Sequence, residues 1–272
     1  MVDEISWRSV PRARNARPFV SGKTHPARHI AIALCSDLHY ASAGEQVRGG
    51  EYEFRAIPNP LVRLAFRIYR HWFWMRHPLH NNPLLDEFLE RAEGFEHAIA
   101  NGDYAADTAF LGVSDAATFE SARLCLAKLR ARFGANLRAG LGDHELGKLS
   151  FFGTYGGLRL ASWRRAHEDL GAQAFWRQDF GRYVLLGVSS SLVALPAFEP
   201  DMLPEERTEW YALRAEHLNR VREVFANLAA SQRVVLFCHD PTALPFLGRE
   251  EVVRARLPQL ELTVIGHLHS NL

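Results

Sequence analysis

Gly266-His267-Leu268-His269 is the most informative segment of the sequence, because four other segments can be interpreted in relation to it. It follows directly on an apolar run, residues 260–265, which predicts a buried strand that opens into a loop at Gly266. Two histidines separated by one residue share a face in a continuing strand and diverge in a turn. Such a pair is by itself more often a surface or hydrogen-bonded pair than a pair of metal ligands. It gains weight because four other segments end in the same way.

The other four segments are apolar runs that end in carboxylate or imidazole side chains. The runs cover residues 29–35, 97–100, 136–140 and 234–238, and each predicts a strand. The side chains that follow them are, in chain order, Asp37 with His39, Asp103, Asp143 with His144, and His239. Each one alone has an ordinary explanation as a turn, a cap or a solvated group. Five such ends, in a chain where strands and helices alternate, indicate one shared site.

The residue types at these ends favour a metal centre. Oxygen and imidazole ligands without thiolate suit manganese, iron, zinc or cobalt better than a structural cysteine–zinc site. The candidates are too many for one tetrahedral ion. Two divalent ions about 3.5–4 Å apart that share one carboxylate would use all of them.

Composition limits the class of protein. The chain has 272 residues, 47% of them hydrophobic, which suits one large α/β domain or two small ones, and we expect a single domain over 1–272. A formal net charge of +1 makes nucleic acid an unlikely partner. Three cysteines form no disulfide framework, and no signal peptide or membrane-spanning run is evident, so we expect a cytoplasmic protein.

Outside the five strand ends, the pattern predicts a basic, proline-punctuated extended arm over residues 1–28 and a hairpin from strands 172–177 and 183–189. Helices are predicted at 84–91, from about residue 115 to 133, at 204–229 and at 249–256.

The segment 61–76 predicts a helix with two distinct faces. Its apolar face holds Leu61, Leu64, Ala65, Ile68, Trp72 and Met75, and its other face holds Arg63, Arg67 and Arg70. One interpretation is a helix packed onto the domain with its arginines in water. The other is a basic, aromatic lip beside the site that holds an anionic lipid or a membrane surface.

The order of the motifs resembles that of the calcineurin-like metallophosphoesterase superfamily. That order is Asp-x-His, Gly-Asp, Gly-Asn-His-Asp/Glu, His and Gly-His-x-His, and it matches residues 37–39, 102–103, 142–145, 239 and 266–269. The resemblance covers the chain from its first core strand to its last residues. It implies a four-layer α/β/β/α sandwich with metals at the strand ends, here with a helical insertion at 57–92 after the first strand.

The resemblance also implies roles for the site residues. One ion would be held by Asp37, His39, Asp103 and His269. Asp103 would bridge to a second ion, held also by Asp143, His239 and His267. His144 matches a non-ligand histidine that contacts the phosphoryl group and protonates the leaving group. The implied activity is hydrolysis of a phosphoester by a hydroxide that bridges the metals, without a protein nucleophile.

Two departures from the family pattern bear on the expected substrate and fold. Asp143 stands where the family usually has asparagine, and its extra negative charge mildly favours diesters or pyrophosphates over doubly charged phosphomonoesters. The chain also stops at Leu272, three residues after His269, whereas the family usually continues with further strands. We therefore expect these C-terminal strands to be absent.

The expected partner is a phosphorylated substrate. The helical insertion resembles, in character, the basic and apolar helices of UDP-2,3-diacylglucosamine pyrophosphate hydrolases, which act on a lipid pyrophosphate. That similarity implies substrate contacts from Arg63, Arg67 and Arg70 and a peripheral contact with lipid or membrane. The alternatives are a nucleotide or cyclic-nucleotide phosphodiesterase, a protein phosphatase, a nuclease and a non-enzymatic metal-binding scaffold. Near-neutral charge disfavours the nuclease, and the complete set of ligands with His144 disfavours the scaffold.

Overall fold

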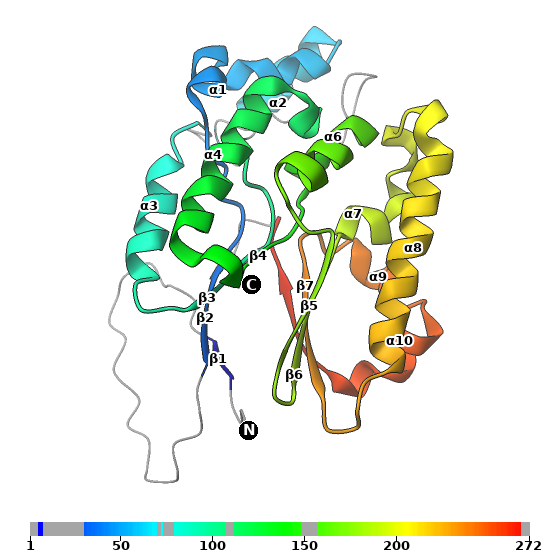
Figure 1. The fold of residues 1–272 in the computed structure, drawn as a ribbon. Helices are drawn as coiled ribbons and strands as arrows, with labels where there is room; N and C mark the ends of the chain where they lie inside the picture. Colours follow the sequence, from blue (N-terminus) through cyan, green and yellow to red (C-terminus); the bar gives the residue numbers. More distant parts are fainter. Residues whose placement is uncertain are drawn as a thin grey trace.

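Two four-stranded sheets lie side by side between two groups of helices (Figure 1). The computed structural model describes residues 5–7, 30–69, 72, 79–106, 111–147 and 157–267. Every strand end predicted to carry a site residue lies in one of these sheets, so the predicted mixed α/β fold is confirmed.

The first sheet is parallel throughout. Its strands lie in the order β1 (Ile5–Trp7), β2 (Ile30–Cys35), β3 (His97–Ala100) and β4 (Leu137–Ala139). The strands β2 and β3 are continuous apolar runs, which is typical of parallel strands covered on both faces. β1 lies within the predicted arm, and the other residues of 1–28 fall outside the described part of the chain.

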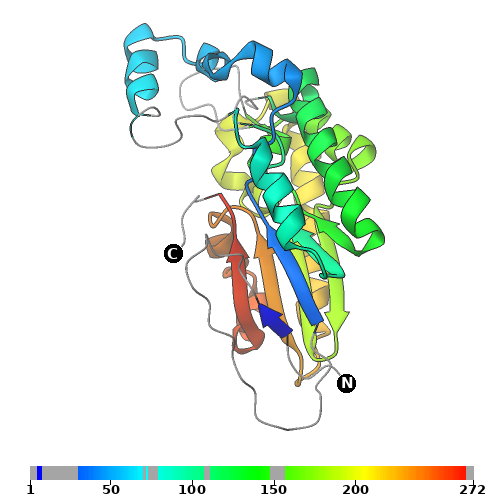
Figure 2. The ribbon, with the colours of Figure 1, turned by 90° about the vertical axis from the view of Figure 1, so that its left-hand side faces the viewer.

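The second sheet begins with the predicted hairpin. β5 (Phe175–Phe180) and β6 (Tyr183–Val188) are antiparallel, and β7 (Arg233–Cys238) and β8 (Leu260–Ile265) then add in parallel. The first hairpin strand starts three residues later than the apolar pattern at 172–177 suggested, because Ala172 and Ala174 are buried in the core ahead of the strand. The parallel strands of both sheets end at the same end of the molecule (Figure 2).

Helices cover the outer faces of both sheets (Figure 1). On the first sheet lie α3 (Asn82–Arg91) and α4 (Ala116–Phe133), and on the second lie α8 (Arg207–Ala226), α9 (Ala243–Leu247) and α10 (Glu251–Ala255). The other helices are α1 (Ala43–Arg48), α2 (Pro60–Tyr69), α5 (Asp143–Leu146), α6 (Leu160–Arg164) and α7 (Ser190–Val193). None of the helices in the described residues is long and apolar enough to cross a bilayer.

The helix α4 shows how the sequence sets an element's limits. The carboxylate of Asp115 accepts hydrogen bonds from the backbone N–H groups of Ala117 and Thr118, at 3.1 and 3.0 Å, and so caps the first turn. The helix ends before Gly134, whose φ of +53° lies in the left-handed region. Between these limits one apolar face packs into the core, as the spacing of three and four residues predicted.

The two sheets share an apolar interior. Ile32 and Ile99 of the first sheet pack in one cluster with Trp176, Leu185 and Phe237 of the second. The rings of Trp176 and Phe237 lie 5.2 Å apart. A Cβ on Gly187 would meet the Trp176 ring at 2.1 Å, so the indole lies directly on that glycine backbone. This contact fixes how closely β5 and β6 approach the rest of the cluster.

The predicted insertion at 57–92 divides into two parts. α3 belongs to the body, because Leu85 and Phe88 are buried against the first sheet's core. α2 does not, because none of its residues is buried. The interpretation of 61–76 as a helix packed onto the domain is therefore wrong for the part described, Pro60–Tyr69 and Trp72. Residues 70–71 and 73–76 of that predicted helix lie outside the described residues.

A buried histidine on α8 yields a prediction about acid stability. His217 is 4% exposed, lies edge-on to Phe175, and its Nε2 has no hydrogen-bond partner within the described chain. Burial, assisted by the charge of Arg220, lowers the pKa of His217 from 6.5 to about 3. The unfolded chain therefore binds a proton below about pH 6.5 that the folded chain binds only near pH 3, so stability is lost as the pH falls through that window.

We expect His217→Leu to flatten the acid limb of the stability curve. The wild-type chain should lose up to about 1.4 kcal/mol per pH unit from this group between about pH 6.5 and 3, and the variant should not. Urea unfolding of chelator-treated protein at several pH values measures the difference. His80→Leu, at an exposed position, is the control. Parallel curves for wild type and His217→Leu would contradict the assignment.

Candidate metal centre

The loops that follow the strands are joined by backbone hydrogen bonds. Asp37 N–H donates to Gly102 O at 3.1 Å, and His39 N–H donates to Asp103 O at 3.1 Å, which continues the parallel pairing of β2 and β3 beyond the sheet. In the second sheet, Gly266 N–H donates to His239 O at 3.0 Å. The polar side chains are thus carried on loops that are held almost as firmly as strands.

Four predicted site residues have a backbone that side chains other than glycine rarely adopt. Asp37, His39, Asp103 and His267 have φ values of +55°, +45°, +56° and +64°, and they are the only non-glycine residues with positive φ in the described part of the chain. Left-handed backbone costs about 1–3 kcal/mol at such a residue and is concentrated at functional sites. The strain turns consecutive side chains toward one point instead of to alternate faces of a strand.

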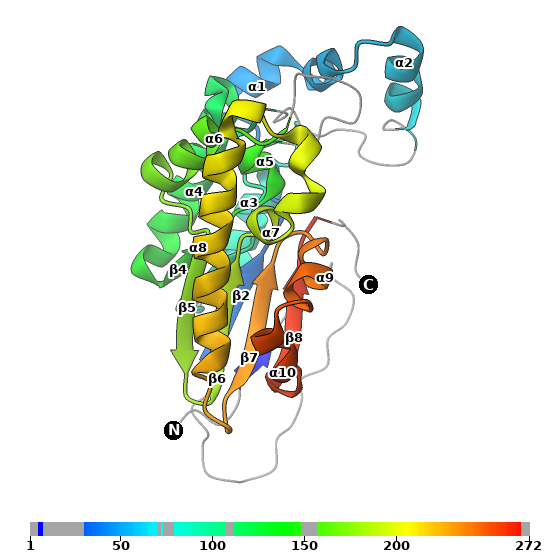
Figure 3. The same cartoon turned by 90° about the vertical axis from the view of Figure 1, so that its right-hand side faces the viewer.

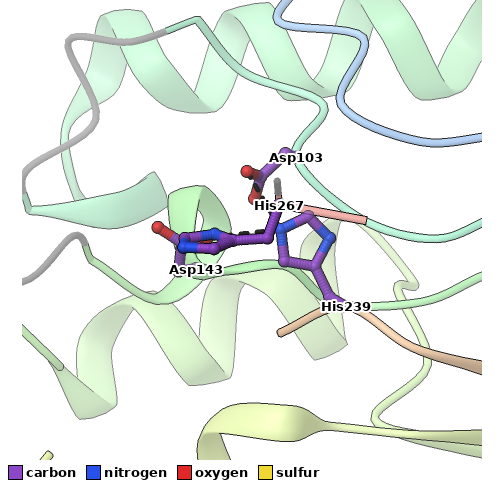
Figure 4. A group of neighbouring side chains, drawn as sticks. All are labelled: Asp103, Asp143, His239 and His267. Carbon is purple, nitrogen blue, oxygen red and sulfur yellow. Dashed lines mark hydrogen bonds and ion pairs between the residues drawn. The ribbon is translucent and has the colours of Figure 1, made fainter. Parts of the chain in front are cut away.

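One cluster joins all four segments that follow β3, β4, β7 and β8 (Figure 4). His239 Nε2 lies 3.1 Å from Asp103 Oδ2 and 3.3 Å from Asp143 Oδ1. His267 Nδ1 lies 3.0 Å from the same Asp143 oxygen. We call these four residues, Asp103, Asp143, His239 and His267, the first cluster. One donor atom from each lies within 4.8 Å of the others.

The orientation of His239 indicates that the first cluster requires a cation. Its Nδ1 lies 2.7 Å from Asn101 O, so Nδ1 carries the hydrogen and Nε2 faces the carboxylates of Asp103 and Asp143. An unprotonated Nε2 would present a lone pair to two negatively charged oxygens. A cation between them, a proton or a metal ion, removes that repulsion. Metal-binding histidines are usually held in this way, by a carbonyl on the far nitrogen.

The pKa shifts of the first cluster also indicate that positive charge stabilises it. Burial lowers the pKa of His239, but the carboxylates of Asp103, Asp143 and Asp37 outweigh it and raise that pKa well above 6.5. The hydrogen bond to Asp143 raises the pKa of His267 to about 9. Burial raises the pKa of Asp143, but the two histidines outweigh it, and the net shift is well below 3.8. The histidines beside Asp143 thus stabilise the anionic form of this carboxylate.

A second cluster shares Asp103 with the first. It comprises His39, Asp103 and His144, all buried. The rings of His39 and His144 lie 4.7 Å apart, and His144 Nε2 is 3.7 Å from Asp103 Oδ2. His144 Nδ1 lies 3.1 Å from the carbonyl oxygens of both Ala105 and Ala106, which directs Nε2 toward Asp103.

Asp37 lies between the two sheets. Its Oδ1 accepts a hydrogen bond from His267 N–H at 2.8 Å and lies 3.9 Å from His239 Nε2. The carboxylate therefore ties the loop after β2 to the loop after β8.

Two glycines permit this close approach. A Cβ on Gly142 would lie 2.0 Å from Asp103 Oδ1, and one on Gly266 would lie 2.2 Å from Ser36 Oγ and 2.7 Å from Asp37 Oδ2. Neither position can hold a larger residue unless a site carboxylate moves. The glycines in Gly-Asp-His and Gly-His-x-His are thus required by packing.

Glu145 was missed as a site residue, since the sequence analysis assigned no role to it. It is fully buried, and its carboxylate accepts from the N–H groups of Gly142, Asp103 and Tyr104 at 2.9, 3.0 and 2.8 Å. Burial and the neighbouring Asp103 raise the pKa of Glu145 to about 7. It holds the loop of Asp103 against that of Asp143. The available signal was its place three residues after Gly142, where a glutamate bonds back to the start of a helix.

The donors present fit divalent metal ions. Carboxylate oxygens and imidazole nitrogens, with no thiolate among them, are ligands for manganese, iron, zinc and cobalt. The structure brings together Asp37, His39, Asp103, Asp143, His144, His239 and His267. His269 lies outside the described residues.

The three arginines predicted to contact substrate are only partly described. Arg63 donates from Nε and Nη2 to Ile57 O, at 3.0 and 2.7 Å, and Arg67 forms an ion pair with Glu51. Arg70 lies outside the described residues. Both described arginines thus have partners in the chain, Arg63 at the start of the insertion and Arg67 just before it.

Comparison with known proteins adds little to this geometry. No family model and no curated protein matches the chain. Among solved structures, it is similar to a phosphopantetheinyl hydrolase (PptH) from Mycobacterium tuberculosis, with 16% identity and a TM-score of 0.42 over 88% of this chain and 82% of that one. At these values the likeness carries no argument about function, and the proposals below depend on the side chains of this chain.

We expect divalent metal to raise the melting temperature of chelator-treated protein, because it compensates the carboxylates of both clusters. Asp103 belongs to both, so Asp103→Asn should remove most of the shift. At 100 times the dissociation constant, binding stabilises by about 2.7 kcal/mol, which amounts to several degrees. Differential scanning fluorimetry with Mn²⁺ measures it. Asp179→Asn, which removes an exposed carboxylate paired with Arg177, should leave the shift intact. An equal shift in Asp103→Asn would refute the shared site.

Proposed function

We propose that this chain is a metal-dependent phosphoester hydrolase of the calcineurin-like metallophosphoesterase type, with two divalent ions and the four-layer sandwich of that superfamily. The observation that carries the proposal is the sharing of Asp103 by two clusters of histidine and aspartate. One shared carboxylate is the expected bridge of a dinuclear centre. The order of motifs along the chain supports the same conclusion.

The residues divide naturally between two ions. Asp103, Asp143, His239 and His267 would hold one ion. Asp37, His39 and Asp103 would hold the other, with His269 as the further ligand that the motif predicts. When bound, such ions activate water for attack at phosphorus and neutralise negative charge on the phosphoryl oxygens.

The contacts of His144 support a role for it on the substrate. Two carbonyl oxygens hold its Nδ1–H, so the ring cannot rotate and Nε2 faces the shared carboxylate. A phosphoryl group bound over Asp103 would lie within reach of this nitrogen. We assign His144 to contact a phosphoryl oxygen and to give a proton to the leaving oxygen.

The charge of the centre favours substrates with a single negative charge at each phosphorus. Asp143 is ionised, and with Asp37 and Asp103 it brings three carboxylates to a site that two divalent ions occupy. Little positive charge is left to attract a doubly charged phosphomonoester. We therefore propose a phosphodiester or a lipid-linked pyrophosphate as the substrate class, with a nucleotide phosphodiester as the alternative within it.

We expect His144→Ala to keep both metal ions and to lose about 10²–10⁴-fold in turnover, the range for loss of a general acid. Hydrolysis of bis-p-nitrophenyl phosphate and metal analysis of the same preparation check this. His80→Ala, an exposed histidine, should behave as wild type.

Metal content decides between the two roles that the geometry allows His144. Because His144 lies in the second cluster, loss of one ion in His144→Ala would make it a ligand and overturn its assignment as the acid. Unchanged turnover with both ions present would overturn the acid role as well.

We expect Asp143→Asn to shift specificity toward phosphomonoesters. The substitution removes one negative charge and supplies an amide N–H₂ that can donate to a phosphate oxygen. The ratio of kcat/KM for p-nitrophenyl phosphate to that for bis-p-nitrophenyl phosphate should rise by roughly tenfold, since one charge at effective dielectric constants near 20 contributes more than about 1.4 kcal/mol. A ratio that stays constant or falls would show that Asp143 does not set this preference.

A further inference from the structure

The helix α2 exposes an apolar ridge that the metal centre does not use. The ridge consists of Leu61, Leu64 and Ile68, which follow one another at intervals of three and four residues on one face of α2, together with Trp72 beyond the end of the helix. Their exposed fractions are 76%, 52%, 50% and 64%. With Tyr69 they make up five of the nine large hydrophobic side chains that the described residues expose. In the described part of the chain, exposed large apolar side chains are thus concentrated on α2 and at Trp72 just beyond it.

Local contacts are sufficient to form α2. The side-chain oxygen of Asn59 accepts hydrogen bonds from the N–H groups of Leu61 and Val62, at 2.9 and 3.3 Å, and Pro60 occupies the first turn. Arg63 bonds to Ile57 O in the preceding loop. None of the residues of α2 is buried. The side chains of the helix therefore stay at least partly exposed, and the start of the helix is fixed by local hydrogen bonds.

The sequence around the ridge is strongly basic. Residues 54–85 contain five arginines and three histidines, and none of the 31 aspartates and glutamates of the chain. Because the whole chain has a formal net charge of only +1, the rest of the molecule is slightly negative. Positive charge is thus concentrated in the same segment as the exposed apolar side chains.

The helix α2 stands away from the body, and the side chains of its ridge are at least half exposed. The helix projects from the body at the end of the molecule where the parallel strands finish (Figures 2 and 3). That is the end at which the two clusters lie, since their residues follow β2, β3, β4, β7 and β8. A flat surface that meets the ridge would therefore lie at the same end of the molecule as the metal centre.

We propose that the α2 ridge docks this protein on the surface of an anionic lipid bilayer. Leucine, isoleucine and tryptophan side chains on one helical face enter the boundary between headgroups and acyl chains, while arginines beside them attract anionic headgroups. The positive charge of the segment favours an anionic bilayer over a neutral surface. A second copy of the chain would place the same arginine-rich segment against itself across a two-fold axis, which is repulsive.

The test is co-sedimentation with vesicles. Wild-type protein should bind vesicles that contain about one third phosphatidylglycerol, bind phosphatidylcholine vesicles at least about tenfold less tightly, and dissociate as salt is raised. The double variant Leu64→Glu/Ile68→Glu should lose at least about tenfold in the partition coefficient, because each side chain then no longer enters the bilayer. Both positions are half exposed, so the variant should fold, and its melting temperature should match that of the wild type.

A matched control is available on the same chain. Leu257 and Leu262 are 45% and 40% exposed and lie outside the insertion, so Leu257→Glu/Leu262→Glu should bind vesicles as the wild type does. Equal loss in both double variants would overturn the proposal, as would wild-type protein that does not bind, or that binds neutral and anionic vesicles equally. A ridge-dependent dimer, or capture of an acidic protein without vesicle binding, would overturn it in favour of that partner.

The docking proposal stands apart from the hydrolase proposal. Hydrolysis of bis-p-nitrophenyl phosphate in the absence of vesicles should be the same for wild type and Leu64→Glu/Ile68→Glu, because neither residue belongs to the metal clusters. Failure of docking would therefore leave the assignment of the metal centre untouched.

Discussion

The carboxylate of Asp103 is the group on which the rest of the centre depends. It is 1% exposed, it lies 3.1 Å from His239 Nε2, and it belongs to both clusters of candidate metal ligands. A buried anion of this kind is costly unless cations and hydrogen-bond donors surround it. The protein supplies the donors: the His144 N–H group contacts Asp103 Oδ1 at 3.0 Å, and histidine rings approach Oδ2 from two sides. The cationic charge that is still lacking suits divalent metal.

The loops around Asp103 are built to hold an arrangement that they would not adopt alone. Four residues of the centre have a left-handed backbone conformation. Gly142 and Gly266 allow contacts that a Cβ would block. Strain of this size persists only when other interactions determine the conformation. Glu145 is one such interaction, because three backbone N–H groups from two loops converge on its carboxylate. Stability of the fold and geometry of the centre are therefore linked through the same few residues.

The insertion and the candidate metal centre depart from the usual distribution of polar and apolar side chains in opposite ways. In the centre, polar groups are buried and each is satisfied by neighbours or by the cation that the cluster demands. On α2, apolar side chains are exposed and basic residues accompany them. Each arrangement is unfavourable for an isolated chain in water and becomes favourable when the missing component is bound: metal in the first case, an anionic surface in our proposal for the second. Both features thus indicate the binding of a component that the polypeptide does not itself supply.

The sequence alone predicted the strands of the described chain except β1, together with the residue types at their ends. Apolar runs of five to seven residues that stop at a glycine, aspartate or histidine are local patterns, so β2, β7 and β8 and the hairpin could be predicted. The order of the motifs also indicated which residues would gather, and the structure brings together every predicted ligand that it describes.

Tertiary structure decided what no local pattern contains. Glu145 looks like a solvated turn residue in sequence, and only the approach of the Asp103 loop, 42 residues away, buries it and fills its bonding capacity. The tautomer of His239 depends on Asn101 O, which lies 138 residues away. For α2, the amphipathic pattern predicts a helix but is the same for a packed helix and an exposed one. The difference lies in whether another element covers the apolar face, and that depends on distant contacts that periodicity does not encode.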